Sequence, residues 1–90
     1  MGMEDIKNEI RQFILTNYLS GEPPSSLQDN TPLQTSGILD SLAVLELASF
    51  IHKEFSVKLS ASETEPDHFD RLADIVALVA ERRRGLRRAS

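Results

Sequence analysis

Residues 40–55 read DSLAVLELASFIHKEF, and this stretch decides the fold that we predict for the 90-residue chain. Its apolar residues recur at helical spacing, so we expect a helix that begins at Asp40 and ends at about Phe55. The Asp40 carboxylate suits the N-cap, where it can accept a hydrogen bond from a free backbone N–H group. The apolar stripe consists of Leu42, Leu45, Ala48, Ile51 and Phe55, and it is widened by Val44, Leu47 and Phe50. A helix that is apolar over so much of its circumference is either central to a bundle or presents a binding surface.

Two more long helices are expected, one on each side of this one. The earlier helix covers residues 4–19 and ends before Pro23 and Pro24, because proline cannot continue the helical hydrogen-bond ladder. The later helix follows Asp70 as its N-cap, and Gly85 is expected to end it. Their apolar faces consist of Ile6, Ile10, Phe13, Ile14 and Tyr18 in the earlier helix and Leu72, Ile75, Val76 and Val79 in the later one.

The connections between these helices complete the predicted fold. Residues 20–39 form a long loop without periodicity, and its apolar side chains are expected to pin it to the core. These are Leu27, Leu33, Ile38 and Leu39. Residues 56–59 alternate like a strand but are too few to build a sheet, and Pro66 favours only a short turn of helix within residues 62–69. We therefore predict an all-α fold, a small four-helix bundle with three long helices and one short helix.

Charge is distributed unevenly along the chain. Residues 4–84 are expected to form a single domain, and residues 85–90 a flexible, Arg-rich tail. All 14 acidic residues but only five of the ten basic residues lie at or before Glu81, which leaves this part strongly negative. An acidic body repels nucleic acid and attracts basic partner surfaces. The Arg-rich end is either a nucleic-acid arm or a helix end whose cations offset the macrodipole, and the acidic body favours the second interpretation.

The composition excludes several classes of function. The chain has no cysteine, which rules out disulfides, thiolate zinc sites and a catalytic thiol of its own and suits a reducing compartment. No apolar stretch approaches the ~20 residues that cross a bilayer, and the N-terminus lacks the basic-then-apolar order of a signal peptide. We therefore expect a cytoplasmic protein with no membrane and no nucleic-acid partner.

The candidate for chemistry is Ser41, in the run Gly37-Ile38-Leu39-Asp40-Ser41-Leu42. At the first turn of a helix, unpaired backbone N–H groups and the helix dipole favour negative charge, so a phosphate attached to Ser41 would occupy a natural anion site. Taken alone, Asp-Ser-Leu is better explained as an ordinary helix start, in which the two polar residues merely cap. The residues around this run, however, favour a chemical role for Ser41 over simple capping.

The sequence from about residue 4 to residue 82 resembles the acyl carrier protein family. The resemblance rests on Asp-Ser-Leu (40–42) opening a Leu-Ala-Val-Leu-Glu-Leu helix, Glu54-Phe55 ending it, Thr31-Pro32-Leu33 in the long loop, and Phe69-Asp70-Arg71-Leu72 opening the last helix. It implies a carrier, not an enzyme, in which a phosphopantetheinyl transferase attaches 4′-phosphopantetheine from coenzyme A to Ser41. The arm ends in a thiol that holds an acyl group as a thioester, which fits a chain without cysteine.

The same resemblance suggests which side chains meet partner enzymes. Asp40 is expected to cap the helix and to help recognition by the transferase. Leu42, Leu45 and Glu46 are expected to form a partner-facing patch, in which leucines supply contact area and the carboxylate supplies orientation. Ser49 is expected near the mouth of any acyl cavity. For the two leucines, plain core packing is an equally good interpretation.

Two departures from fatty-acid carriers narrow the predicted type. Gly37 lies four residues before the serine, and the Gly-Ile-Leu-Asp-Ser run is more similar to D-alanyl carriers and to freestanding aminoacyl or peptidyl (thiolation) carriers. Ala43, His52 and Lys53 stand where fatty-acid carriers often have acidic residues. The resemblance thus implies a carrier of an aminoacyl or short acyl group, and we expect it to be a monomer. Its expected partners are an adenylating loading enzyme and the acyl-processing enzymes of nonribosomal peptide or polyketide-type natural-product biosynthesis.

Two other functions are compatible with parts of the sequence. The chain could be an unmodified helical adaptor that binds a partner through its second helix. A small serine hydrolase would need a base for Ser41, and only His52 and His68 are available. His52 lies about three turns away along the helix, too far for proton transfer. No set of histidines and carboxylates has metal-ligand spacing, so no metal is expected.

Overall fold

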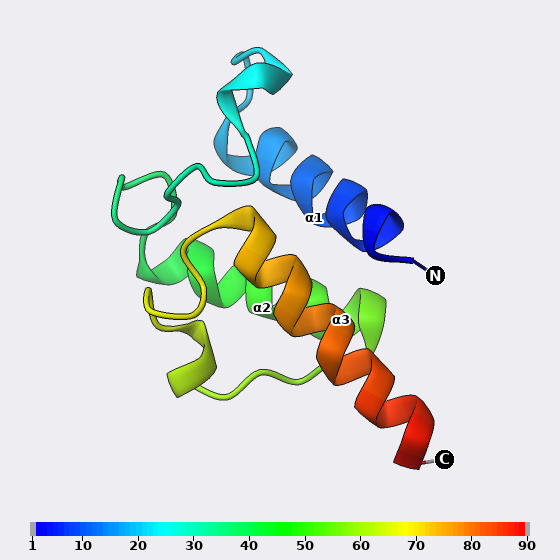
Figure 1. Cartoon of the computed structure of the whole chain (residues 1–90). Coiled ribbons are helices and arrows are strands. Elements are labelled where there is room, and N and C mark those ends of the chain that lie inside the picture. Colours follow the sequence, from blue (N-terminus) through cyan, green and yellow to red (C-terminus); the bar gives the residue numbers. More distant parts are fainter. Residues whose placement is uncertain (1, 90) are drawn as a thin grey trace.

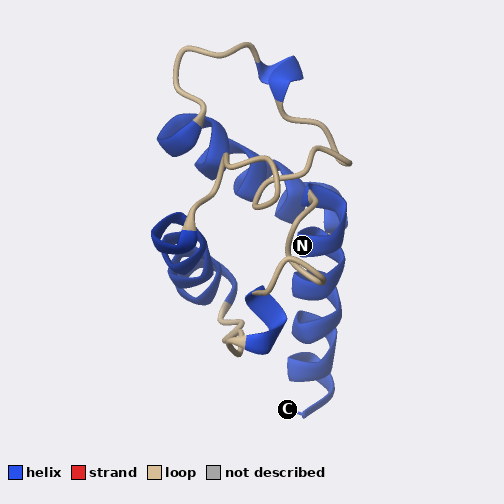
Figure 2. Ribbon diagram, turned by 90° about the vertical axis from the view of Figure 1, so that its left-hand side faces the viewer, coloured by secondary structure: helices blue, strands red, loops and turns tan. Residues whose placement is uncertain are grey.

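Three α-helices make up most of the protein. The computed structural model describes the backbone of residues 2–89 and the side chains up to residue 85. Helix α1 covers Met3–Tyr18, α2 covers Ser41–Phe55 and α3 covers Leu72–Ala89 (Figure 1). Two short 3-10 turns, Pro24–Ser26 and Ser62–Thr64, lie in the connections (Figure 2). The described residues contain no strand, so the predicted all-α class is confirmed, and the short fourth helix is a single 3-10 turn.

Apolar side chains from all three helices and both connections form one core. Helix α1 contributes Ile6, Ile10 and Ile14, as its helical spacing predicts. The long loop before α2 is fastened to the core by Leu27, Leu33 and Leu39, which are fully or almost fully buried, with the half-buried Ile38 packed against them. From α3 come Leu72, Ile75, Val76 and Val79. The predictions for these three segments are confirmed.

Helix α2 buries only part of the apolar surface that its sequence predicts. Its buried residues are Ala43, Val44, Leu47, Ile51 and Phe55. Leu42 and Leu45, which we placed in the central apolar stripe, are 64% and 63% exposed. The helix has more apolar residues than one packed face can cover, because a face wide enough for Val44 and Leu47 leaves Leu42 and Leu45 on the far side. Helix α2 is therefore both a core helix and a helix with an exposed apolar surface.

The two ends of α3 also differ from expectation. Asp70 does not cap this helix: its carboxylate bonds to the loop before α2, and the backbone carbonyl of Asp29 accepts the Ala73 N–H in the first turn of α3. Gly85 does not end the helix, which continues to Ala89. One glycine costs a helix only about 1 kcal/mol, and the neighbouring residues are good helix formers. The predicted flexible tail at 85–90 falls partly outside the described residues and stays a prediction.

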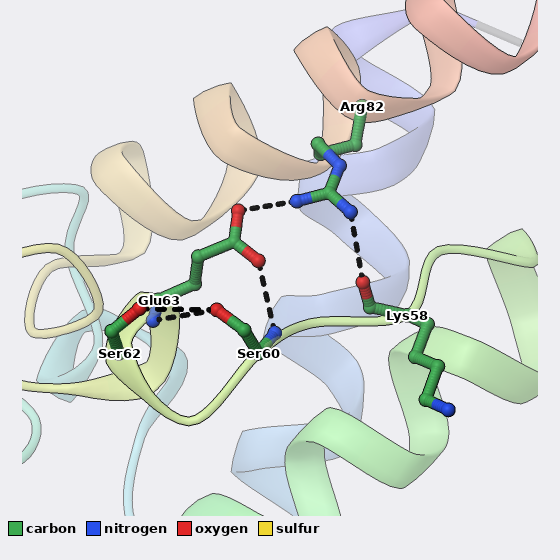
Figure 3. A network of polar contacts seen from close by, with 5 residues as sticks. All are labelled: Lys58, Ser60, Ser62, Glu63 and Arg82. Atoms are coloured by element: carbon green, nitrogen blue, oxygen red, sulfur yellow. Dashed lines mark hydrogen bonds and ion pairs between the residues drawn. The ribbon is translucent and has the colours of Figure 1, made fainter.

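A polar network ties α3 to the connection that follows α2 (Figure 3). The Arg82 guanidinium pairs with Glu63 and also donates a 3.1 Å hydrogen bond to the backbone carbonyl of Lys58. Glu63 in turn accepts the Ser60 N–H at 2.9 Å. The bond from Ser60 and the Arg82 cation hold the pKa of Glu63 below its usual value. Arg82 therefore has a structural role, which is to hold the connection after α2 against α3.

Candidate functional site

Ser41 is the first residue of α2, and the residue before it holds the start of the helix. Asp40 has extended backbone angles, and its Oδ1 accepts the Ala43 N–H at 2.8 Å, while its carbonyl accepts the Val44 N–H at 2.9 Å. This is the predicted N-cap, and it is confirmed. The Ser41 side chain is exposed, and within the described part of the chain its hydroxyl has no hydrogen bond. The site thus presents a free hydroxyl on a fixed backbone.

The surroundings of Ser41 suit an anion. The first N–H groups of any α-helix lack an intrahelical partner, and here Asp40 satisfies only that of Ala43. The N–H groups of Ser41 and Leu42 therefore stay open at the positive end of the helix dipole. A phosphodiester on the Ser41 hydroxyl would lie beside these groups. The residues present therefore fit 4′-phosphopantetheine, whose attachment point is such a phosphate.

The loop that leads to Ser41 is closed by its own hydrogen bonds. The Leu39 N–H donates to the Leu33 carbonyl at 2.8 Å, and the Gly37 N–H donates to the Gln34 carbonyl at 3.1 Å. Gly37 has a φ of 89°, in the left-handed region that favours glycine, which explains glycine at this position. The Ser36 hydroxyl donates a 2.5 Å hydrogen bond to the Pro32 carbonyl. The chain therefore enters α2 from an ordered turn.

The expected partner-facing residues share the exposed side of α2. Leu42, Leu45, Glu46 and Ser49 are all exposed, and their spacing of three or four residues places them on one face near Ser41. Leu42 and Leu45 are the only exposed large aliphatic side chains of α2, so core packing is excluded for both. Large apolar groups left in water next to a reactive position are typical of a contact surface.

Glu46 has an intramolecular partner that sequence reasoning missed. The Tyr18 hydroxyl, at the end of α1, donates a 2.5 Å hydrogen bond to Glu46 Oε1. Burial, this hydrogen bond and the negative charges of Glu46 and Asp40 raise the pKa of Tyr18 to about 12. In the sequence Tyr18 is simply the last member of an apolar stripe, and no local signal pairs it with a residue of α2. The structure thus joins α1 to the face of α2 that carries Ser41.

Among the described residues, no side chain forms a hydrogen bond with the Ser41 hydroxyl that would activate it as a nucleophile. His52 and His68 are both exposed, and no hydrogen bond joins either side chain to Ser41 in the described part of the chain. Among the described residues, no group of three or more histidines and carboxylates could hold a metal ion. None of the described helices is both long and apolar enough to cross a membrane. The described side chains therefore do not form a catalytic arrangement around Ser41 of the kind that a serine nucleophile needs.

Comparison with known proteins decides the family. The model of the family described as "Phosphopantetheine attachment site" matches residues 19–80, which include Ser41 and all of α2. The chain belongs to this family. Members of the phosphopantetheine attachment family are carriers rather than enzymes, and 4′-phosphopantetheine is attached to them covalently. The resemblance to acyl carrier proteins seen in the sequence is thereby confirmed.

Two similar proteins support the assignment. The chain is 32% identical over 74 residues to "Probable acyl carrier protein PigG" of Serratia sp. (strain ATCC 39006), which covers 82% of this chain and 84% of that protein. A chain from a structure titled "Crystal structure of FAD-dependent dehydrogenase" is 37% identical and superposes with a TM-score of 0.68. That match covers 78% of this chain and 97% of the other chain. The similar chain is therefore as small as this carrier.

Proposed function

We propose that Ser41 carries the 4′-phosphopantetheine arm of this carrier. The observation that supports the proposal is an exposed serine, free of side-chain hydrogen bonds, at the first position of a capped helix inside the matched region. In the transfer, the Ser41 Oγ forms a bond to the β-phosphorus of coenzyme A, adenosine 3′,5′-bisphosphate leaves, and the hydroxyl proton is lost. When attached, the arm supplies a terminal thiol that holds an acyl group as a thioester.

Each neighbouring residue has a part in this proposal. Asp40 keeps the first turn of α2 formed whether or not the serine is modified, and its exposed carboxylate is available to a transferase. Leu42 and Leu45 provide apolar contact area for partner enzymes, and Glu46, held by Tyr18, provides a charge of fixed orientation. Ser49 lies at the far edge of this surface.

We further propose an aminoacyl or short acyl cargo in natural-product biosynthesis, loaded by an adenylating enzyme. The support is the Gly-Ile-Leu-Asp-Ser run and the exposed His52 and Lys53, which replace acidic residues usual in fatty-acid carriers. Ala43 cannot be counted with them. Its side chain is only 4% exposed, so Ala43 itself is part of the core and not of the exposed surface of α2.

A FAD-dependent dehydrogenase is the class of downstream enzyme that we propose. The proposal is supported by the similar small chain, which comes from a structure titled "Crystal structure of FAD-dependent dehydrogenase". In the reaction, two hydrogens leave neighbouring atoms of the thioester-bound group as a hydride and a proton. The cargo gains a double bond, and FAD becomes FADH2. The carrier contributes attachment and presentation, and because the chain has no cysteine it supplies no thiol of its own.

The proposal is tested by intact-mass spectrometry of the purified chain after incubation with coenzyme A and a broad-specificity transferase. A carrier gains one phosphopantetheine, and fragmentation places it on Ser41; an adaptor gains nothing. The holo protein is then offered a panel of aminoacyl and acyl donors with their adenylating enzymes. A loaded carrier that bleaches the FAD absorbance of a dehydrogenase without oxygen supports the downstream step.

We propose that the carrier works in the cytoplasm and that it is a monomer.

A further inference from the structure

Asp70 joins the start of α3 to the loop that precedes Ser41. Its Oδ1 accepts three consecutive backbone N–H groups, those of Leu33 at 3.1 Å, Gln34 at 2.7 Å and Thr35 at 3.0 Å. Its Oδ2 accepts the Thr35 hydroxyl at 2.9 Å. Burial acts to raise the pKa of Asp70, but the bonds from Thr35, Gln34 and Leu33 outweigh it and hold the pKa below the usual value. The carboxylate is therefore a charged acceptor for one short segment of loop.

A second set of bonds fastens the same segment. The Gln34 side-chain amide donates to the backbone carbonyls of Thr64 at 2.9 Å and Phe69 at 2.8 Å. The Leu33 N–H also donates to the Asp70 carbonyl at 2.7 Å. Residues 33–35 are thus tied to residues 64–70 by side-chain and backbone hydrogen bonds together. We call this arrangement the Asp70 latch.

The latch acts on the stretch of chain that ends at the attachment site. From Leu33 the loop returns on itself, since the Leu39 N–H donates to the Leu33 carbonyl at 2.8 Å. Leu39 lies two residues before Ser41 and is buried, and Asp40 then caps α2. One end of this closed loop is held by Asp70, and the other end is the first turn of α2. The hydrogen bonds to Asp70 thus fix one end of the closed loop whose other end leads into Ser41.

We infer that Asp70 is a positioning residue for modification of Ser41. The inference rests on the proposed attachment at Ser41. Asp70 makes no contact with the serine, and it acts by restricting the approach loop to the conformation that a transferase binds. Without the latch, only a fraction of molecules is competent at any moment, and the apparent affinity for the transferase falls by that fraction. The KM for the apo-carrier should rise, whereas kcat should stay the same, because a bound carrier has already adopted the competent conformation.

The test is steady-state transfer of phosphopantetheine from coenzyme A to apo-carrier variants, followed by intact mass. Asp70→Ala removes all four bonds to the carboxylate. Asp70→Asn keeps an oxygen for the N–H groups, but it removes the negative charge and places an NH2 donor where the Thr35 hydroxyl had its acceptor. Asp67→Asn is the matched control, because Asp67 is exposed and has no hydrogen bond among the described residues. Ile6→Val, a core truncation in α1, controls for general loss of stability.

We expect the KM of Asp70→Ala to rise by about three- to tenfold at unchanged kcat, and that of Asp70→Asn to rise less. Amide exchange of Leu33, Gln34 and Thr35 should quicken in the same order. Both control variants should behave like wild type. An unchanged KM in a folded Asp70→Ala protein overturns the inference, and if this variant does not fold, an unchanged KM and amide exchange in Asp70→Asn do so. A wild-type chain that gains no phosphopantetheine instead overturns the proposed function itself.

Discussion

The Tyr18 hydroxyl donates a 2.5 Å hydrogen bond to Glu46 Oε1, and this bond links the last turn of α1 to the exposed face of α2. The acceptor is a carboxylate and the donor is half-buried, a combination that makes the bond stronger than one between neutral, exposed groups. The same bond orients the carboxylate of Glu46, which follows the exposed Leu45 in α2. Under the proposed function, this pair of residues serves both partner recognition and stability.

Tyr18→Phe should lower the free energy of unfolding by about 1 kcal/mol, because the ring is kept and only the hydrogen bond is lost. The effect should depend on pH. The pKa of Tyr18 is raised to about 12 in the folded protein from 10.0, so its stabilisation is complete below pH 10 and is lost as the pH rises through about 12. Urea unfolding of both proteins at pH 8 and at pH 11 measures this. Curves that differ equally at both pH values contradict the assignment.

Asp40→Ala should destabilise the protein by about 1 kcal/mol, since the N–H of Ala43 loses its acceptor. Modification should slow as well, because the first turn of α2 is less well formed. Asp40→Ser keeps a capping oxygen and separates the two roles. If Asp40→Ser restores stability but not the transfer rate, the carboxylate itself is recognised by the transferase; if transfer returns with stability, capping alone explains the effect.

The surface charge of α2 should decide how well fatty-acid enzymes use this carrier. Lys53→Glu changes an exposed cation and should increase the rate of malonyl transfer to the holo protein, most clearly at low salt. Ala43→Asp should instead destabilise the fold by about 3 kcal/mol or more, because this position is buried. A salt series on wild type and Lys53→Glu tests the steering. Wild-type transfer already as fast as that of a fatty-acid carrier contradicts the proposed aminoacyl cargo.

Deleting residues 85–90 should change the free energy of unfolding by less than about 1 kcal/mol. The described contacts near this end, from Arg82 to Glu63 and from Arg83 to the Phe55 ring, lie before the deletion and are kept. Thermal unfolding of the shortened chain measures the effect. A large fall in melting temperature would show that the last residues pack on the body of the protein.

The sequence alone predicts those helices and helix starts that depend only on residues close together in the chain. The helix beginning after Asp40 and the apolar spacing of Ile6, Ile10 and Ile14 depend on near neighbours, and the structure confirms both. The exposure of Leu42 and Leu45 could not be settled in advance, because α2 has more apolar residues than one face can bury, and packing of the whole bundle selects the buried arc.

The long-range polar contacts were not predictable in the same way. Asp70 looked like a helix cap because it precedes an apolar helical pattern, yet its carboxylate bonds to Thr35 and its neighbours, far away in the sequence. Tyr18 and Glu46 are likewise separated by 28 residues. Such pairs arise only once the helices are placed. The prediction that Gly85 ends the last helix was wrong, because a single glycine is a weak stop signal among residues that favour a helix.

The central claim is that Ser41 alone carries the phosphopantetheine arm, and intact mass of Ser41→Ala tests it most directly. Ser20→Ala is the matched control, since Ser20 is an exposed serine outside the partner-facing surface. After incubation with coenzyme A and a transferase, wild type and Ser20→Ala should each gain one phosphopantetheine. Ser41→Ala should gain none, with its unfolding free energy nearly unchanged because Asp40 still caps the helix. A phosphopantetheine found on the Ser41→Ala protein, at Ser36, Ser49 or elsewhere, would contradict the account.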